Sequence, residues 1–401
     1  MAIDNKDKKV LNVPHLRFPE FSGEWEEHTL SEYLEFKNGL NPDAKRIGSG
    51  LPFISVMDIL SEGVINYDNI RGKVNATEKE IECFGVKDGD LLFQRSSETL
   101  EDVGRANVYM DNRTAIYGGF VIRGRKIGNY DPLFFKYLLA TPLARKRTCR
   151  MGAGAQHFNI GQEGLSKISL YFPSIEEQRK IAEFLSLIDE RIATQNKIIE
   201  DLKKLKSAII EIEYSPKDSY HSHIGGAIVQ ISKRNKDNHL CNVLSVSNRQ
   251  GFIKQSEQFE DRNVASDDTS NYKIVEKNDF AYNPARINVG SIARLTKFET
   301  GIVSPMYICF RTKDCLLPEY LELFFESRNF FYHIQKRLEG SVRLCLSYEE
   351  LCNIPIVIPS IEKQKQVDLH LSKLAQKIDL EMKILQFVQQ QKTYLLHQMF
   401  I

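Results

Sequence analysis

The chain has 401 residues, of which 42% are hydrophobic and 27% are charged, and its formal net charge is +1. This length allows two or three domains with cores of their own, and the composition is ordinary for a globular protein. No apolar run reaches the roughly 18 residues of a membrane-spanning helix, and the polar start lacks the apolar core of a signal peptide. We therefore expect a cytoplasmic protein with no membrane partner.

The seven cysteines show no Cys-x-x-Cys spacing, and His221 and His223 lie in a polar stretch with no third type of metal ligand nearby. Structural zinc sites usually carry such spacings. We expect the cysteines to be small hydrophobic residues in a reducing compartment. The sequence thus predicts no metal site and no cofactor in this chain.

The first part of the chain has mixed helix and strand patterns. Residues 1–14 are expected to form a mobile N-terminal arm, and residues 15–172 an α+β domain. The runs LSEYLEF, LPFISV, DLLFQ and GGFVIRG are apolar, short and bounded by Gly, Pro, Asn and Asp, which is typical of strands. The stretch DPLFFKYLLATPLARKRT, from Asp131 to Thr148, has helical spacing after its Asp-Pro start.

Two long helices are predicted, over residues 173–213 and 359–401. In each, apolar residues step by four and three positions in turn, which is the seam of a helix that pairs with another helix. The seam residues are Ile181, Leu185, Ile188, Ile192, Ile199, Leu202 and Ile209 in the first helix, and Val367, Leu371, Leu374, Ile378, Leu385, Val388 and Leu395 in the second.

The two seams share one register. Their residue numbers differ by a constant offset of 186 at every position, and both seams turn polar at the same two places, Gln195 with Glu381 and Lys206 with Lys392. Shared defects in a shared register indicate an internal duplication.

A second mixed domain, residues 214–358, repeats the landmarks of the first. LPEYLELFF at Leu317 echoes DPLFFKYLL at Asp131, and GSVRLCLSYEEL at Gly340 echoes GAQHFNIGQEGL at Gly154, again at an offset of 186. Further upstream the offset is 189, because loop lengths differ. We predict an α+β fold in which two similar domains are separated by two long antiparallel helices, with an internal pseudo-two-fold repeat.

Such an arrangement is suited to measuring a distance. A helix of about 40 residues is about 60 Å long. Two similar domains held apart by such a rod could read two half-sites on DNA, because equivalent faces of the duplex recur about every 34 Å. Basic residues also cluster locally in RGRK, ARKRTCR and SKRNK, although a solvated surface is an alternative for each cluster.

Three segments carry a resemblance to a known family. VPHLRFPEFSGEWEEHTL at Val13, PSIEEQRKIAEFLSLIDERI at Pro173 and PSIEKQKQV at Pro359 look like the conserved segments of specificity subunits of Type I restriction-modification systems. The resemblance implies two target-recognition domains that each read half of a bipartite site in double-stranded DNA, with helical spacers that set the gap. It also implies two methyltransferase subunits and two restriction subunits, ATP-dependent translocase-nucleases, as partners that use S-adenosylmethionine, ATP and Mg.

Catalysis is expected to lie outside this chain. The sequence has no G-x-x-x-x-G-K-[ST] loop for ATP. It also has no Asn-Pro-Pro-Tyr or Asp-Pro-Pro-Tyr string for a flipped adenine; the nearest string, Asn283-Pro284-Ala285-Arg286, lacks the stacking aromatic residue. We therefore predict no catalytic residue.

Candidate DNA-reading residues have directional donors and acceptors and lie in loops at corresponding places of the repeat. Turn chemistry explains each loop equally well when it is taken alone. The candidates are Gln94, Arg95, Ser96, Ser97, Gln156, His157 and Asn159 in the first domain, and Asn283, Arg286, Asn288, Ser291, Ser341 and Arg343 in the second. Arg145, Lys146, Arg147 and Arg150 are candidates for phosphate contacts.

Two other functions are compatible with the sequence. The first is a structural scaffold that tethers two protein partners without reading DNA. The second is a cryptic enzyme such as a nuclease, which would require metal-dependent turnover by the purified chain alone.

Overall fold

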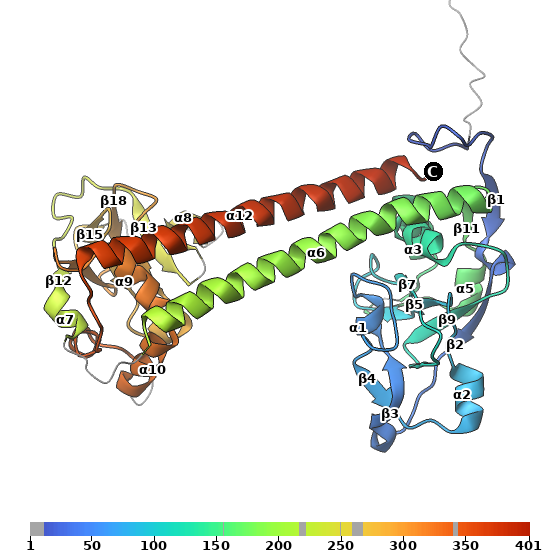
Figure 1. Cartoon of the computed structure of the whole chain (residues 1–401), viewed down its shortest axis with the longest axis horizontal. Coiled ribbons are helices and arrows are strands. Elements are labelled where there is room, and N and C mark those ends of the chain that lie inside the picture. Colours follow the sequence, from blue (N-terminus) through green and yellow to red (C-terminus); the bar gives the residue numbers. More distant parts are fainter. Residues whose placement is uncertain (1–11, 155, 216–221, 249, 259–267, 340–343) are drawn as a thin grey trace, which may run out of the picture. The chain divides into compact units, whose positions relative to one another are not determined.

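The computed structural model describes residues 12–154, 156–215, 222–248, 250–258, 268–339 and 344–401, so most of the expected N-terminal arm lies outside the described residues. The chain divides into two compact units, Met1–Asn196 with Lys383–Ile401, and Lys197–Met382. Each unit joins a sheet-rich domain to a part of two long helices, α6 (Ile175–Glu213) and α12 (Ile361–Gln398) (Figure 1). The predicted α+β fold with long helices is confirmed.

The first domain contains two main sheets. One has the antiparallel order β2 (Leu34–Asn38), β9 (Val121–Lys126), β5 (Leu91–Gln94), β7 (Ala106–Val108). The other has the order β4 (Gly72–Val74), β3 (Ile47–Ile54), β8 (Ile116–Tyr117), in which β3 and β8 are parallel. Two strand pairs complete the domain: β1 (Glu26–Thr29) with β11 (Ser169–Phe172), and β6 (Ser96–Ser97) with β10 (Phe158–Asn159).

The helices of this domain are short. They are η1 (Leu30–Glu32), η2 (Ala44–Arg46), α1 (Val56–Ile59), α2 (Glu78–Phe84), α3 (Pro132–Ala140), α4 (Pro142–Arg150) and α5 (Gln162–Ser166). The helical stretch expected from Asp131 to Thr148 is broken into α3 and α4. Pro142 has no N–H to continue α3, and the Thr141 side chain accepts from the Ala144 N–H and caps α4 instead.

The second domain also contains two sheets. One has the order β12 (Ile228–Ile231), β19 (Ile308–Thr312), β16 (Phe280–Tyr282), β17 (Ile292–Arg294). The other has the order β14 (Gly251–Lys254), β13 (Val243–Ser247), β18 (Thr300–Val303), β15 (Lys273–Glu276), in which β13 and β18 are parallel. Its helices are α7 (Ile224–Ala227), α8 (Gln255–Gln258), η3 (Ile287–Val289), α9 (Pro318–Phe325), α10 (Arg328–Arg337) and α11 (Tyr348–Cys352).

The ends of the long helices are built into the domain cores. In the first unit, Ile181 and Leu185 at the start of α6 share a core with Met399 and Phe400, which follow α12. In the second unit, Ile210 near the end of α6 shares a core with Val367 and Leu371 at the start of α12. The two helices therefore run in opposite directions.

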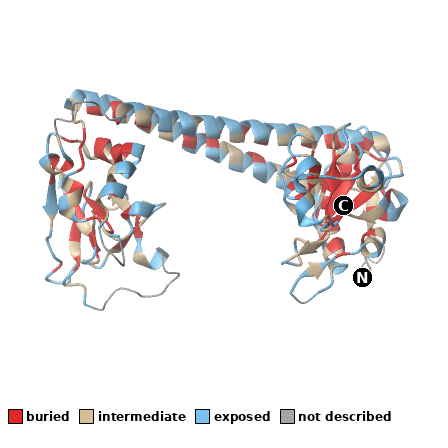
Figure 2. Ribbon diagram, turned by 90° about the horizontal axis from the view of Figure 1, so that it is seen from below, coloured by how far each residue is buried: buried red, intermediate tan, exposed pale blue. Residues whose placement is uncertain are grey.

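Burial along the helices follows the expected seam. Figure 2 shows buried residues concentrated in the sheet-rich domains, whereas the long helices are exposed along much of their length. All fourteen apolar seam residues are nevertheless buried or half-buried. The polar seam residues Gln195 and Glu381 are buried as well, at 8% and 7% exposure.

A buried glutamine joins each long helix to its own domain. The Gln178 side chain donates to the Pro173 carbonyl at 3.0 Å and accepts from the Asp131 N–H at 3.1 Å. Asp131 in turn caps α3, since its carboxylate accepts from the Phe134 N–H. The start of α6 and the start of α3 are thus held by one amide group.

The second half repeats this arrangement at the same offset of 186. The Gln364 side chain donates to the Pro359 carbonyl at 2.9 Å and accepts from the Leu317 N–H at 2.8 Å. A buried aspartate is also repeated. Asp90 and Asp279 each accept from the N–H three residues earlier, and each forms an ion pair with an arginine, Arg125 and Arg311 respectively. These shared hydrogen bonds support the internal duplication expected from the sequence.

We predict that Gln178→Ala lowers the free energy of unfolding by about 1–3 kcal/mol, because it leaves the half-buried Asp131 N–H and Pro173 carbonyl without their partner. Hydrogen exchange should show faster exchange of the α3 amides and unchanged exchange in α9. Gln364→Ala should have the converse effect. Gln390→Ala, which changes an exposed glutamine of α12, is the control and should stay within about 0.5 kcal/mol. A Gln178→Ala variant that behaves like this control would contradict the proposed junction.

Candidate nucleic-acid interface

The first domain brings its two candidate reading loops together. Strand β6 pairs with β10 in antiparallel register, with Ser96 opposite Asn159 and Ser97 opposite Phe158. The Ser96 hydroxyl donates a hydrogen bond to the Asn159 side-chain oxygen, and the Ile160 N–H donates to the Arg95 carbonyl at 3.0 Å. Two loops that lie far apart in the sequence thus form one surface.

The accessible side chains of this surface belong to a few of the candidates. Gln156, His157 and Asn159 are exposed, while Arg95 is partly exposed and its guanidinium donates to the Gly119 carbonyl at 3.4 Å. Amide and imidazole groups can donate hydrogen bonds to base edges and accept them, and a guanidinium group can donate to bases and to phosphates. The surface is therefore suited to directional hydrogen bonding.

Gln94 occupies a different kind of position from its neighbours. Its side chain is only 5% exposed, and its amide donates to the Ser96 carbonyl at 2.9 Å. A direct contact with a base was expected for this residue. In this conformation the buried Gln94 side chain instead stabilises the loop at Ser96 by this hydrogen bond.

The phosphate candidates on α4 separate into two pairs. Lys146 and Arg150 are exposed. Arg145 instead points into the domain, where it donates to the carbonyls of Glu101 and Val103 at 2.8 and 2.7 Å. Burial lowers the pKa of the Arg145 guanidinium from its usual value.

Arg147 is also used within its domain. Its guanidinium forms an ion pair with Glu27 at 2.7 Å, donates to Ser169 and lies 5.5 Å from the centre of the Tyr171 ring. It therefore ties α4 to the β1–β11 pair. Sequence reasoning could not separate inward from outward arginines on this short helix, because the partners come from distant segments.

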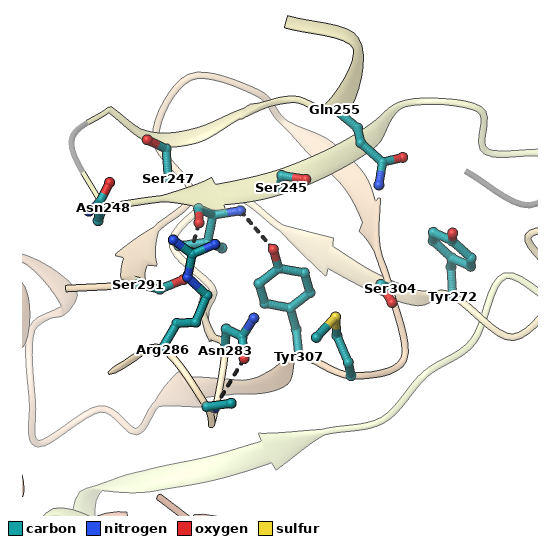
Figure 3. A pocket seen from close by; sticks show the side chains of 13 residues that line it. Ser245, Ser247, Asn248, Gln255, Tyr272, Asn283, Arg286, Ser291, Ser304 and Tyr307 are labelled. Carbon is teal, nitrogen blue, oxygen red and sulfur yellow. Dashed lines mark hydrogen bonds between the residues drawn. The ribbon is translucent and has the colours of Figure 1, made fainter. Parts of the chain in front are cut away.

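The second domain places three of its six candidates around a pocket of about 410 Å³ (Figure 3). Arg286 lines it and is exposed, whereas Asn283 and Ser291 are 7% and 4% exposed. The Asn283 side chain accepts from the Ala285 N–H at 3.1 Å, and the Ser291 hydroxyl donates to the Val246 carbonyl. These two side chains shape the loop that presents Arg286.

Asn288 is exposed in the 3-10 helix η3 and is absent from the pocket lining. Ser341 and Arg343 lie outside the described residues. Sequence reasoning missed several polar residues that line the pocket, among them Ser245, Asn248, Gln255, Tyr272 and Tyr307. They come from separate strands and loops, so no local motif could have found them.

The two candidate sites share several backbone contacts. The Leu346 N–H donates to the Pro284 carbonyl at 3.1 Å, which is the counterpart of the bond from Ile160 to Arg95. The isolated bridges Ala153–Asn159 and Glu339–Cys345 also correspond, at an offset of 186. Each domain thus presents one loop after a central strand against a second loop that precedes the long helix.

Comparison with known proteins gives a match for the first domain and part of α6. Residues 22–204 match the family model described as the Type I restriction modification DNA specificity domain. Over this segment, which is less than half of its length, the chain is similar to Type I specificity subunits.

The individual specificity subunits that resemble this chain have low sequence identity to it. The chain is 25% identical over 210 residues to the type I restriction enzyme MjaVIII specificity subunit of Methanocaldococcus jannaschii, an alignment that covers 51% of this chain and 45% of that protein. It is 26% identical over 151 residues to the EcoKI specificity subunit of Escherichia coli K12, covering 37% of this chain and 32% of that protein. The matched region thus spans about half, or less, of the length of these curated relatives.

The fold of the whole chain resembles a solved specificity subunit. The crystal structure of the Type I restriction-modification S subunit from M. genitalium superposes with a TM-score of 0.58 at 15% identity, covering 97% of this chain and 99% of that chain. At this identity the match concerns the fold alone.

Metal sites and membrane-spanning helices are described here for the residues that the structure covers. No group of three or more His, Cys, Asp or Glu residues in that part of the chain could hold a metal ion. None of its helices is both long enough and apolar enough to cross a membrane.

We predict that Arg145→Ala lowers the free energy of unfolding by about 1.5–3 kcal/mol, because two carbonyls lose a charged donor. Lys146→Ala, its exposed neighbour, should stay within about 0.5 kcal/mol of the wild type. Chemical denaturation of both variants measures the difference. Equal stability of the two variants would show that Arg145 does not hold the segment after the reading loop.

Proposed function

We propose that this chain is the DNA-sequence-specificity subunit of a Type I restriction-modification complex and has no catalytic role of its own. Each of its two target-recognition domains, residues 15–172 and 214–358, reads one half of a bipartite site in double-stranded DNA. The paired helices α6 and α12 set the number of unread base pairs between the half-sites. Two methyltransferase subunits, and two translocase-nuclease subunits for cleavage, carry out adenine methylation or restriction with S-adenosylmethionine, ATP and Mg.

The observation that carries this proposal is that the two domains share backbone hydrogen bonds at their candidate reading loops but differ in the side chains of these loops. The bond from Ile160 to Arg95 has its counterpart in the bond from Leu346 to Pro284. The side chains of the loops differ, because Arg95 in the first domain corresponds to a proline in the second, where Arg286 supplies the guanidinium. Two domains that read different DNA sequences require different hydrogen-bond donors, and a shared backbone arrangement can present them.

The composition of the candidate sites supports DNA as the ligand. Most of the side chains that line the pocket of the second domain carry hydroxyl or amide groups, and Arg286 and three apolar residues complete the lining (Figure 3). Such groups recognise base edges by fixed hydrogen-bond directions, and arginine serves both bases and phosphates. A tether for two protein partners would have no need of this polar lining.

The outer surface of the long helices offers a place for the methyltransferase partners. Phe387 and Tyr394 of α12 are 67% and 61% exposed and line a groove with Arg191 and Val388. Large exposed apolar side chains with a neighbouring charge are common in protein interfaces. The partners would then contact the spacer rather than the reading loops.

We predict that replacing residues 15–172 by the corresponding domain of another family member changes one half of the methylated motif and leaves the other half unchanged. The physical reason is that each set of reading loops belongs to one compact unit. Single-molecule sequencing of methylated bases in cells that carry the chimera and its methyltransferase measures the result. A change in both halves would contradict separate readers.

We also predict that inserting one heptad after Lys197 and one after Lys383, equivalent positions of the repeat, lengthens the unread gap by about 10 Å, or roughly 3 base pairs. A heptad preserves the seam, so the helices can still pair. An insertion in α6 alone is the control and should abolish methylation, because it destroys the shared register. An unchanged gap after the double insertion would refute the spacer role.

A further inference from the structure

Each domain exposes one large apolar side chain at an equivalent position. Phe120 is 68% exposed, and Met306, its counterpart at the offset of 186, is 57% exposed. Each is the third residue of a four-residue turn that is closed by the same hydrogen bond, from Val121 N–H to the Gly118 carbonyl at 2.9 Å and from Tyr307 N–H to the Ser304 carbonyl at 3.1 Å. The duplication has therefore kept an apolar residue on a turn where burial does not require one.

Both turns lie beside the candidate reading loops. The Arg95 N–H donates to the Phe120 carbonyl at 2.9 Å, and the Arg95 guanidinium donates to the carbonyl of Gly119 in the same turn. In the second domain, Met306 lines the same pocket as Asn283 and Arg286. The apolar side chain and the polar reading groups thus share one surface in each domain.

The turn that carries Phe120 is held firmly. The Gly118 N–H donates to the Ile54 carbonyl at 3.0 Å, and a Cβ atom on Gly119 would lie 1.8 Å from the side-chain oxygen of Asn41. The turn is thus hydrogen-bonded to β3 and packs closely against the Asn41 side chain. A Phe side chain left in water forgoes the free energy that burial would provide, so a surface that covers it would gain this stabilisation.

The surroundings of these residues favour DNA as that surface. Arg95, Ser96 and Asn159 lie in the loops beside the Phe120 turn, and most of the side chains that line the pocket with Met306 are polar. A protein-docking patch would be a contiguous apolar area. Duplex DNA instead offers flat apolar base faces between phosphates, and Phe and Met are among the side chains that wedge between base steps.

We infer that Phe120 and Met306 are apolar DNA contacts, each of which wedges against one base step of its own half-site and partly unstacks it. This inference rests on the proposed function, since it requires that the two domains bind the two half-sites. It adds a role for sequence-dependent deformability, because pyrimidine–purine steps unstack most easily. Specificity would then extend to a step that no polar side chain touches.

The test uses the full chain assembled with its methyltransferase subunits and duplexes of the methylated motif that carry 2-aminopurine at successive positions of each half-site. Wild-type complex should raise the fluorescence at one step in each half. Phe120→Ala should abolish the rise in the first half-site only and weaken binding about tenfold, and Met306→Ala should do the same in the second half-site. Phe120→Met should retain the signal, because Met306 performs this role in the other domain.

Two control variants separate this role from general loss of apolar surface. Ile127 is 59% exposed at the opposite end of the strand that Phe120 precedes, and Val229 is 49% exposed in β12. Ile127→Ala and Val229→Ala should leave fluorescence and affinity unchanged, and thermal melting should show that all four alanine variants are folded.

The results of these experiments can refute the wedge role of Phe120 and Met306 separately from the proposed DNA-specificity function. If the wild-type complex binds the bipartite duplex and Phe120→Ala behaves like Ile127→Ala, the wedge is refuted and the proposed function stands. If Phe120→Ala weakens methyltransferase assembly without altering the DNA signal, the side chain is a protein contact and the inference is again wrong. If the wild-type complex shows no preference for either half-site, the proposed function itself fails.

Discussion

The burial of the long-helix ends inside the sheet-rich domains is the constraint on which the rest of the structure depends. A spacer can fix a distance only if its ends cannot slide or rotate against what they carry. Ile181 and Leu185 of α6 belong to the core of the first domain, and Val367 and Leu371 of α12 belong to the core of the second. The buried amides of Gln178 and Gln364 then fix each helix start to a domain helix through hydrogen bonds, which are far more directional than apolar packing.

This constraint explains what the duplication has kept and what it has changed. The two halves share the glutamine junction, the buried aspartates Asp90 and Asp279, and the backbone bonds that place the reading loops. They differ in the side chains that the loops present. Retaining the frame while exchanging exposed side chains costs little stability, since substitutions of exposed residues rarely change it by more than about 0.5 kcal/mol. A duplicated scaffold can therefore acquire two specificities without being rebuilt.

The sequence was most informative where one physical requirement acts on many residues at once. The seam was predictable because helix pairing imposes a period on burial, and the offsets of 186 and 189 located the corresponding loops of the second half. The strands over DLLFQ and GGFVIRG were also predictable, since buried strands need short apolar runs.

Individual side-chain directions were not predictable in the same way. Arg145 and Arg147 look like surface cations in the sequence, yet each is bound by groups from distant segments. Gln94, Asn283 and Ser291 look like readers, yet they are buried under the loops they support. Phe120 and Met306 look like core residues, and only their spacing of 186 together with their exposure reveals the shared turn. Such directions depend on tertiary partners that no local pattern contains.

The central claim is that one chain reads two half-sites at a set separation, and the methylated motif tests it most directly. Single-molecule sequencing of methylated bases should be applied to cells that carry this chain and its methyltransferase, with cells that lack the chain as the reference. The account predicts one motif with two specified halves and a gap of constant length. A continuous motif, a variable gap, or methylation that does not depend on this chain would contradict it.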